Sequence, residues 1–305
     1  MTLAEEEISV VSAKLPAVAQ GASTASAGRG RLVLEKIDKT FPGTRMAAVR
    51  QLSLTCEPGE FVVVVGPSGC GKSTLLNVAA GMLKPEGGRV LLDGRPVNGP
   101  GPDRAVVFQD HGLFPWLTAQ QNIEFGLKMA GMGRDHRRQR VQEALRMVHL
   151  SQSGRKLVHE LSGGMRQRVA IARALVMNPS VLLMDEPFAA LDAQTRTLMH
   201  AQVQDLWVQT RKTILFVTHS VGEAVRLADR IVVLHAHPGR IRTEIAIELP
   251  HPRNFDSREI GELVHRVRRE IEDEVNRVNA QMAEYWKPQT PDDLGGHLVD
   301  MGGGI

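Results

Sequence analysis

The chain is poor in cysteine and lacks both a long apolar run and a strong excess of one charge. Two cysteines in 305 residues, Cys56 and Cys70, are too few for a disulfide framework, which favours a reducing cytoplasm. No stretch approaches the ~18 apolar residues needed to span a bilayer, so we expect any connection to a membrane to pass through a partner. A net charge of +3 gives no indication of a nucleic-acid-binding surface.

The two ends of the chain differ in composition from its middle. Residues 1–29 are rich in Ala, Ser and Gly and open on acidic residues, which predicts a disordered leader rather than a secretory signal. Residues 30–250 carry the motifs described below, and 251–305 are predicted to form a C-terminal extension. Apolar residues there recur at three- and four-residue steps, which predicts an amphipathic helix over about 257–280 and then a flexible tail. This helix either packs on the main domain or serves as a dimer or regulatory contact.

Residues 66–74 fit the phosphate-binding pattern G-x-x-x-x-G-K-[ST]. The β-branched run at 61–65 predicts a buried parallel strand before the loop, and a helix is predicted over 73–80 after it. Glycine lets backbone N–H groups approach phosphate oxygens, the helix N-terminus adds a positive dipole, and the lysine supplies a mobile cation. The sequence therefore predicts a nucleoside triphosphate site made of Gly66, Pro67, Ser68, Gly69, Cys70, Gly71, Lys72, Ser73 and Thr74.

An acidic pair follows a second apolar run, 181–184. Strands and helices alternate through this half of the chain, which predicts a mostly parallel sheet with helices on both faces. Ligands bind at the carboxyl edge of such sheets, where Asp185 and Glu186 lie. We expect Asp185 on the Mg²⁺ side and Glu186 as the general base that deprotonates the attacking water. A solvated acidic pair at a strand end is the plain alternative.

A second motif lies between these two. Residues 161–168 read Leu-Ser-Gly-Gly-Met-Arg-Gln-Arg and precede a predicted helix, so they form another anion-binding N-terminus. With the phosphate loop and the acidic strand end, this motif resembles the ATP-binding subunit of ABC transporters over about residues 32–250. The resemblance implies an α/β fold with a P-loop NTPase core on a mostly parallel sheet. It also implies an antiparallel β subdomain and an inserted helical signature subdomain at about 110–175, to which this chain adds a C-terminal helical extension.

The resemblance also implies roles for single residues. Gln109 would sense Mg²⁺ and the attacking water, His219 would contact the γ-phosphate, and Phe41 would stack on adenine. A competent site would need two chains, because the signature faces the ATP of the opposite subunit and Asp192 lies in the loop that links the two sites. The implied signature residues are Leu161, Ser162, Gly163, Gly164 and Arg168. The implied cofactors are ATP and Mg²⁺, with the metal near Ser73, Gln109 and Asp185.

A narrower resemblance lies in residues 99–109 and 113–118, which are similar to the ATP-binding subunits of importers for nitrate, sulfonate, taurine and related anions. It implies a homodimer, integral membrane permease subunits and, indirectly, a solute-binding protein as partners, and no nucleic acid. The implied location is peripheral, at the cytoplasmic face of the cell membrane. The apolar cluster from Leu113 to Trp116 either belongs to the core of the helical subdomain or lines a groove for a permease helix.

Two other functions use the same phosphate loop. An ABC ATPase of a non-transport process usually carries two cassettes or a long coiled coil, and this sequence has neither. A regulatory nucleotide-binding scaffold has no need of Glu186 and His219. The solute does not touch an ATP-binding subunit, so nitrate, a sulfonate, taurine and bicarbonate all stay open.

Overall fold

The computed structural model describes residues 28–285 apart from 45, 237 and 254–256. The leader predicted for residues 1–29 lies outside the described residues except for its last two positions, and the predicted tail from 286 onward lies outside them as well. Among the described residues, no helix combines the length and the apolar character needed to cross a bilayer.

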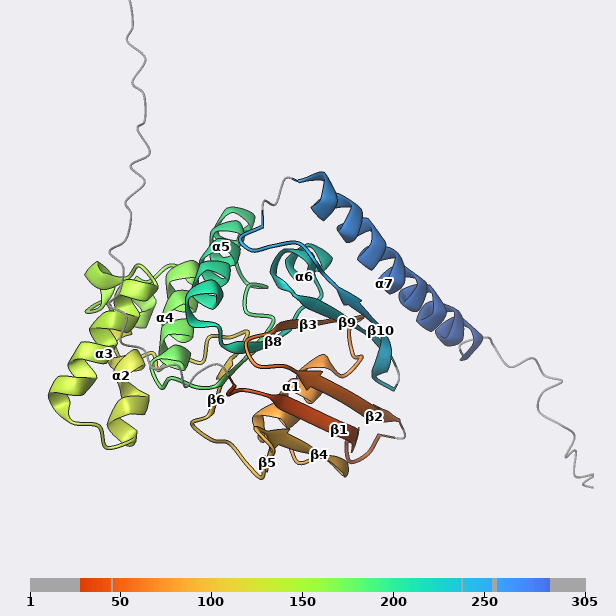
Figure 1. Ribbon diagram of the computed structural model, residues 1–305, viewed down its shortest axis with the longest axis horizontal. Coiled ribbons are helices and arrows are strands. Elements are labelled where there is room, and N and C mark those ends of the chain that lie inside the picture. Colours follow the sequence, from red (N-terminus) through yellow and green to blue (C-terminus); the bar gives the residue numbers. More distant parts are fainter. Residues whose placement is uncertain (1–27, 45, 237, 254–256, 286–305) are drawn as a thin grey trace, which may run out of the picture.

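Two β-sheets form the framework (Figure 1). The smaller sheet is antiparallel, has the order β2-β1-β4-β5, and consists of β1 (Leu32–Thr40), β2 (Ala47–Cys56), β4 (Gly87–Leu92) and β5 (Arg95–Pro96). The larger sheet has the order β10-β9-β3-β8-β7-β6, with β3 (Phe61–Val65), β6 (Arg104–Val107), β7 (Val181–Asp185), β8 (Thr213–Val217), β9 (Arg230–His235) and β10 (Arg240–Ala246). Its strands are parallel except for β10, which pairs antiparallel with β9 at the edge. The predicted α/β class, with a mostly parallel sheet and an antiparallel subdomain, is confirmed.

The central strands are apolar along their whole length because both faces of the larger sheet are covered. All residues of β3 are buried, and alternate residues join opposite core clusters. Phe61, Val63 and Val65 pack toward α4 (Gly163–Leu175), α5 (Ala193–Thr210) and α6 (Val221–Leu227). Val62 and Val64 pack toward α1 (Lys72–Ala80) and the antiparallel sheet. The two-residue period of a strand thus fixes β3, and the loop that follows it, between two rigid layers.

A third core cluster belongs to the helices inserted between β6 and β7, which stand at one side of the molecule in Figure 1. They are α2 (Ala119–Met129), α3 (Arg134–Met147) and the first part of α4, with short 3₁₀ turns at Ser151–Ser153 and Val158–Glu160. Thr118 and Gln121 form a reciprocal capping box that fixes the start of α2. The residues buried between these helices include Ile123, Leu127, Val141, Leu145 and Val169.

The long helix α7 (Arg258–Tyr285) covers the side of the molecule formed by α6, β9 and β10 (Figure 1). It runs beyond the end that the apolar pattern predicted. Ile260 and Val267 are buried in the same core cluster as α5 and α6, and Leu263, Val264 and Ile271 are partly buried against it. The apolar face of α7 therefore packs on the main domain.

Candidate functional site

One edge of the larger sheet collects residues from four separate parts of the chain. The adjacent strands β3, β8, β7 and β6 are parallel, so their carboxyl ends meet at the same edge. The phosphate loop follows β3, His219 follows β8, Asp185 ends β7, and Gln109 follows β6. The register aligns Val64 with Val217, Val217 with Asp185, and Met184 with Val107. The structure therefore brings the residues predicted for catalysis to one edge of the sheet.

The phosphate loop is shaped by two glycines and ends at a helix N-terminus. Gly69 and Gly71 have φ angles of 77° and 89°, which glycine adopts without strain. A Cβ atom on Gly71 would lie 2.6 Å from the carbonyl oxygen of Ala48, so no side chain fits there. Helix α1 begins without a capping side chain, which leaves its first amide groups for a bound anion. Lys72 reaches back across the loop and donates from Nζ to two of its carbonyl oxygens at 2.9 Å.

Ser73 and Asp185 place two oxygen ligands side by side next to the loop. The Ser73 hydroxyl donates to Oδ1 of Asp185 at 3.0 Å. Burial raises the pKa of Asp185, while the hydrogen bond from Ser73 acts in the opposite direction. Hydroxyl and carboxylate oxygens are the ligands that Mg²⁺ prefers, so this pair fits the predicted metal residues. Gln109, the third predicted ligand, is exposed in the turn after β6.

Glu186 and His219 are in direct contact. Oε2 of Glu186 lies 2.8 Å from Nδ1 of His219, and the two side chains are 21% and 64% exposed. The φ angle of Glu186 is 43°, a left-handed conformation that costs a non-glycine residue roughly 1–2 kcal/mol. Its backbone N–H donates to the carbonyl of Val217 at 2.9 Å, which holds the strained residue against the end of β8. Strain of this kind is concentrated at functional sites.

A buried carboxylate that the sequence analysis did not single out supports the loop that carries His219. Thr218, the preceding residue, donates from its hydroxyl to Oε2 of Glu223 at 2.6 Å. Nε2 of His200, on α5, lies 3.3 Å from the other carboxylate oxygen. Burial disfavours the charged form of Glu223, but the contacts with His200 and Thr218 outweigh burial and hold its pKa below the usual value. In the sequence, Glu223 lies in the first turn of a helix, where a carboxylate usually stays exposed to solvent and interacts with the helix dipole.

The signature residues cap and begin α4. Ser162 is the N-cap residue, and its Oγ accepts a hydrogen bond from the backbone N–H of Met165 at 3.3 Å. Leu161 is buried in the core of the helical subdomain, and Arg168 donates to the carbonyl of Val148 there at 3.4 Å. In the part of the chain that the structure describes, the hydrogen bonds of residues 161–164 reach neither the phosphate loop nor the acidic pair.

The start of α5 lies against the signature. A Cβ atom on Gly164 would lie 2.4 Å from Cγ2 of Thr195, and one on Gly163 would lie 3.5 Å from Cδ2 of Leu191. Asp192 caps α5 by accepting a hydrogen bond from the backbone N–H of Thr195 at 2.9 Å, which lowers the pKa of Asp192. The small signature residues thus let the two helix N-termini approach each other within one chain.

Phe41 lies directly after β1 and is 40% exposed. Nζ of Lys39 lies 5.9 Å from the centre of its ring, and the backbone turns after Phe41 through a hydrogen bond from the N–H of Thr44. The ring therefore has a free surface, as the predicted stacking role requires.

The apolar cluster after Gln109 divides between core and surface. Leu113 packs partly buried against the core, and the ring of Phe114 lies 4.7 Å from that of Phe125 and 5.6 Å from that of Trp116, centre to centre. Trp116 itself is 71% exposed. The start of the cluster therefore belongs partly to the core, as one interpretation predicted, and Trp116 at its end is left on the surface.

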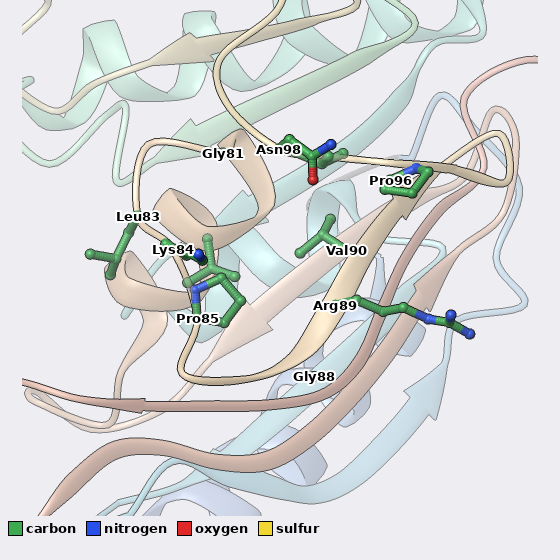
Figure 2. A pocket seen from close by; sticks show the side chains of 11 residues that line it. Gly81, Leu83, Lys84, Pro85, Gly88, Arg89, Val90, Pro96 and Asn98 are labelled. Carbon is green, nitrogen blue, oxygen red and sulfur yellow. The ribbon is translucent and has the colours of Figure 1, made fainter.

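A separate hollow lies between the end of α1 and strands β4 and β5 (Figure 2). Figure 2 shows Leu83, Lys84 and Pro85 on one side of it and Arg89, Val90 and Pro96 on the other. None of the residues predicted for the site lines this hollow.

A glycine-shaped phosphate loop, an acidic pair and a histidine on one sheet edge define a nucleotide-hydrolysing protein of the P-loop class. Residues 49–189 match the family model described as ABC transporter. An uncharacterized ABC transporter ATP-binding protein of Methanocaldococcus jannaschii is 46% identical over 247 residues, covering 80% of this chain and 92% of that protein. The taurine import ATP-binding protein TauB of Pseudomonas aeruginosa is 49% identical over 220 residues, covering 72% of this chain and 84% of TauB.

Among solved structures, the dimeric post-hydrolysis state of the ATP-binding cassette MJ0796 bound to ADP and Pi is similar. It has a TM-score of 0.63 and 34% identity, and the match covers 72% of this chain and 100% of that chain. The chain therefore belongs to the ABC transporter family and is an ABC ATPase.

Proposed function

We propose that this chain is the ATP-hydrolysing subunit of an importer, working as a homodimer that drives a small solute through a membrane permease. The observation that carries the proposal is the meeting of the phosphate loop, Asp185, Glu186 and His219 on one sheet edge. Similarity to a protein named for taurine import favours taurine or a related anion as the solute.

Binding of ATP begins at the phosphate loop. The backbone N–H groups of residues 66–74, apart from Pro67, and the N-terminus of α1 cradle the phosphates. Lys72 exchanges its two carbonyl contacts within the loop for β- and γ-phosphate oxygens. The half-exposed ring of Phe41 stacks on adenine.

Ser73 and Asp185 are placed to hold Mg²⁺ together with Gln109. Bound there, Mg²⁺ would supply positive charge that offsets the negative charge of the phosphates. A bound cation would favour the ionised form of Asp185, against the effect of its burial, because opposite charges at short range lower a carboxyl pKa.

Glu186 takes a proton from the water that attacks the γ-phosphate. The contact between its Oε2 and Nδ1 of His219 fixes the carboxylate, and Nε2 is then the ring nitrogen left to face the γ-phosphate. Glu223 and Thr218 hold the loop on which His219 stands. The base and the histidine thus act as one hydrogen-bonded unit.

The signature of a second copy completes the site. Residues 161–164 have no hydrogen bond to the phosphate loop among those described within one chain, and the N-terminus of α4 is suited to a phosphate anion. Ser162, Gly163, Gly164 and Arg168 of each copy therefore serve the ATP of the other. Asp192, beside the signature, links the two sites.

The exposed end of the cluster after Gln109, Trp116 above all, contacts the permease. The proposal includes a peripheral location at the cytoplasmic face of the membrane, an indirect solute-binding protein partner and no nucleic-acid partner. Residues 30–250 form the ATPase domain, with the helical subdomain at about 110–175, and 251–305 form the extension.

Uptake of labelled solute into proteoliposomes tests the proposal. Vesicles holding the chain with its permease and solute-binding protein are expected to take up taurine only with ATP and Mg²⁺ on the side of this chain. Glu186→Gln should abolish uptake, and Trp116→Asp should leave ATP binding intact but prevent assembly with the permease. Uptake of nitrate or bicarbonate instead of taurine would correct the proposed solute but would still support the importer function. ATP-driven release of solute, or no transport with an assembled complex, would refute it.

A further inference from the structure

Helix α7 buries a carboxylate at its interface with the main domain. The side chain of Glu274 is 0% exposed, although its helix is otherwise rich in exposed charges. Glu274 continues the apolar stripe of α7, in which Ile260 and Val267 are buried and Ile271 is partly buried. An apolar residue would be expected at its position. A carboxylate at such a position is costly to bury unless it is paired and hydrogen-bonded.

The partners of Glu274 lie mainly at the end of β9. Oε2 is 2.7 Å from Nδ1 of His235, and Oε1 accepts the backbone N–H of Ala236 at 2.8 Å. Arg242, on β10, approaches Oε2 at 3.5 Å, and Arg277 donates to both carboxylate oxygens. Burial disfavours the charge, but these contacts outweigh it and lower the pKa of Glu274 to about 2.

Helix α7 holds both backbone polar groups of one residue in the connection between β9 and β10. Glu274 accepts from the N–H of Ala236, and Nη2 of Arg277 donates to its carbonyl at 3.2 Å. Because the acceptor and the donor stand one turn apart on the same helix, they fix the position of Ala236 relative to α7.

Two residues near Ala236, Leu234 of β9 and Gly239 just before β10, lie close to the phosphate loop. A Cβ atom built on Gly66, the first loop residue, would lie 3.1 Å from the carbonyl oxygen of Leu234, and one on Gly239 would lie 2.2 Å from the carbonyl oxygen of Cys70. Gly239 also donates to the carbonyl of Ala48 at 3.1 Å. Leu234 and Gly239 therefore lie against the loop, Leu234 at its first position and Gly239 at its fifth.

We propose that Glu274 is a positioning residue for the phosphate loop: through Ala236 it holds Leu234 and Gly239 against the loop, so that α7 sets the affinity for ATP. The inference rests on the proposed role of residues 66–74 as the phosphate site. It gives the C-terminal helix a specific effect on the ATPase domain, beyond covering apolar surface.

Two measurements on the full chain test this role. The first is the affinity for a fluorescent ATP analogue together with KM and kcat for ATP. The second is the alkylation rate of Cys70 relative to Cys56, without nucleotide, by mass spectrometry of the peptides. Both thiols are 0% exposed, but only Cys70 lies in the loop, so Cys56 reports general unfolding. Glu274→Ala should weaken ATP binding and raise KM at least about fivefold, the lower end of typical couplings between sites, with little change in kcat. It should also speed labelling of Cys70 and not of Cys56.

Glu272→Ala is the matched control, since Glu272 is exposed on the same helix and its loss changes the net charge equally. Glu274→Gln keeps an acceptor for the N–H of Ala236 and should lie between wild type and alanine; if the alanine variant does not fold, the glutamine variant decides in the same two assays. Unchanged affinity and labelling, or equally faster labelling of both cysteines, would overturn the proposal. Failure of the wild-type chain to bind ATP would instead refute the phosphate site itself.

Discussion

Glu186→Gln separates the chemistry of hydrolysis from the binding of ATP. The substitution keeps the length and shape of the side chain, so an oxygen or amide group still faces Nδ1 of His219 across a contact of 2.8 Å. It removes the carboxylate that is proposed to take the proton from water. A general base contributes about 10²–10⁴-fold, which corresponds to about 3–5 kcal/mol of activation free energy. The hydrogen-bonded pair Ser73–Asp185, proposed to hold Mg²⁺, is separate from this contact, so binding of ATP should be unaffected.

The assay combines phosphate release with light scattering of the purified chain in ATP and Mg²⁺. The wild-type chain should hydrolyse ATP and be dimeric only transiently, whereas Glu186→Gln should lose turnover and accumulate as an ATP-bound dimer. Glu262→Gln, which alters an exposed carboxylate on α7, is the control and should behave as wild type. A variant that still hydrolyses ATP at a near-normal rate would refute the base, and a monomer that turns over ATP would refute the two-chain site.

Four further predictions concern other parts of the molecule. Lys72→Ala should weaken ATP binding about tenfold or more, since hydrogen bonds to charged groups contribute about 1.5–3 kcal/mol; titration with a fluorescent nucleotide measures this, and unchanged affinity would contradict it. Ser162→Ala removes the N-cap of α4 and should lower the free energy of unfolding by about 1 kcal/mol in urea denaturation, with hydrolysis lost and single-chain ATP binding kept. Trp116→Asp should change the free energy of unfolding by no more than about 0.5 kcal/mol, because the ring is largely exposed. The permease should no longer co-purify with this variant; if it did, the permease would bind at another surface. The carboxyl pKa of Glu274 is lowered to about 2, so its contribution to stability should be complete above the unfolded pKa, near 4.3, and disappear as the pH falls toward 2; the stability gap between wild type and Glu274→Gln should therefore close over that range, and a gap independent of pH would contradict the ion pairs.

The motifs from which the site is predicted are local in the sequence. A phosphate loop, an apolar strand ending in Asp185–Glu186, and a histidine after a strand each have a short pattern that can be read without the fold. Their meeting follows from the parallel sheet, since carboxyl ends of parallel strands share one edge. The contact between Glu186 and His219 depends on the strand order, which places β8 between β3 and β7 and which no local pattern specifies.

What the sequence did not indicate depends on contacts between distant residues. Strand β10 carries three consecutive polar residues, from Arg242 to Glu244, so its sequence resembles a surface loop until β9 is present as a partner. Glu274 lies 39 positions from its partner His235. The sequence did contain one signal: Glu274 lies on the apolar face of the predicted amphipathic helix, where a carboxylate is unexpected. Glu223 had no such clue, because a carboxylate in the first turn of a helix is common at the surface.

The conformation of Glu186 gives a last test of whether this residue is kept for chemistry or for folding. Its φ of 43° is unfavourable for any residue with a Cβ atom, and the following Pro187 further favours extended backbone at this position. Glu186→Gly should therefore raise the melting temperature or leave it unchanged, because glycine adopts this φ without strain, although the contact to His219 is lost. Glu186→Val, whose branched side chain tolerates a positive φ least, should lower it. Both variants should lack hydrolysis. If the glycine variant were instead as unstable as the valine variant, loss of the contact with His219 would account for the destabilisation of both. The backbone strain at Glu186 would then not reduce the stability of the wild-type chain.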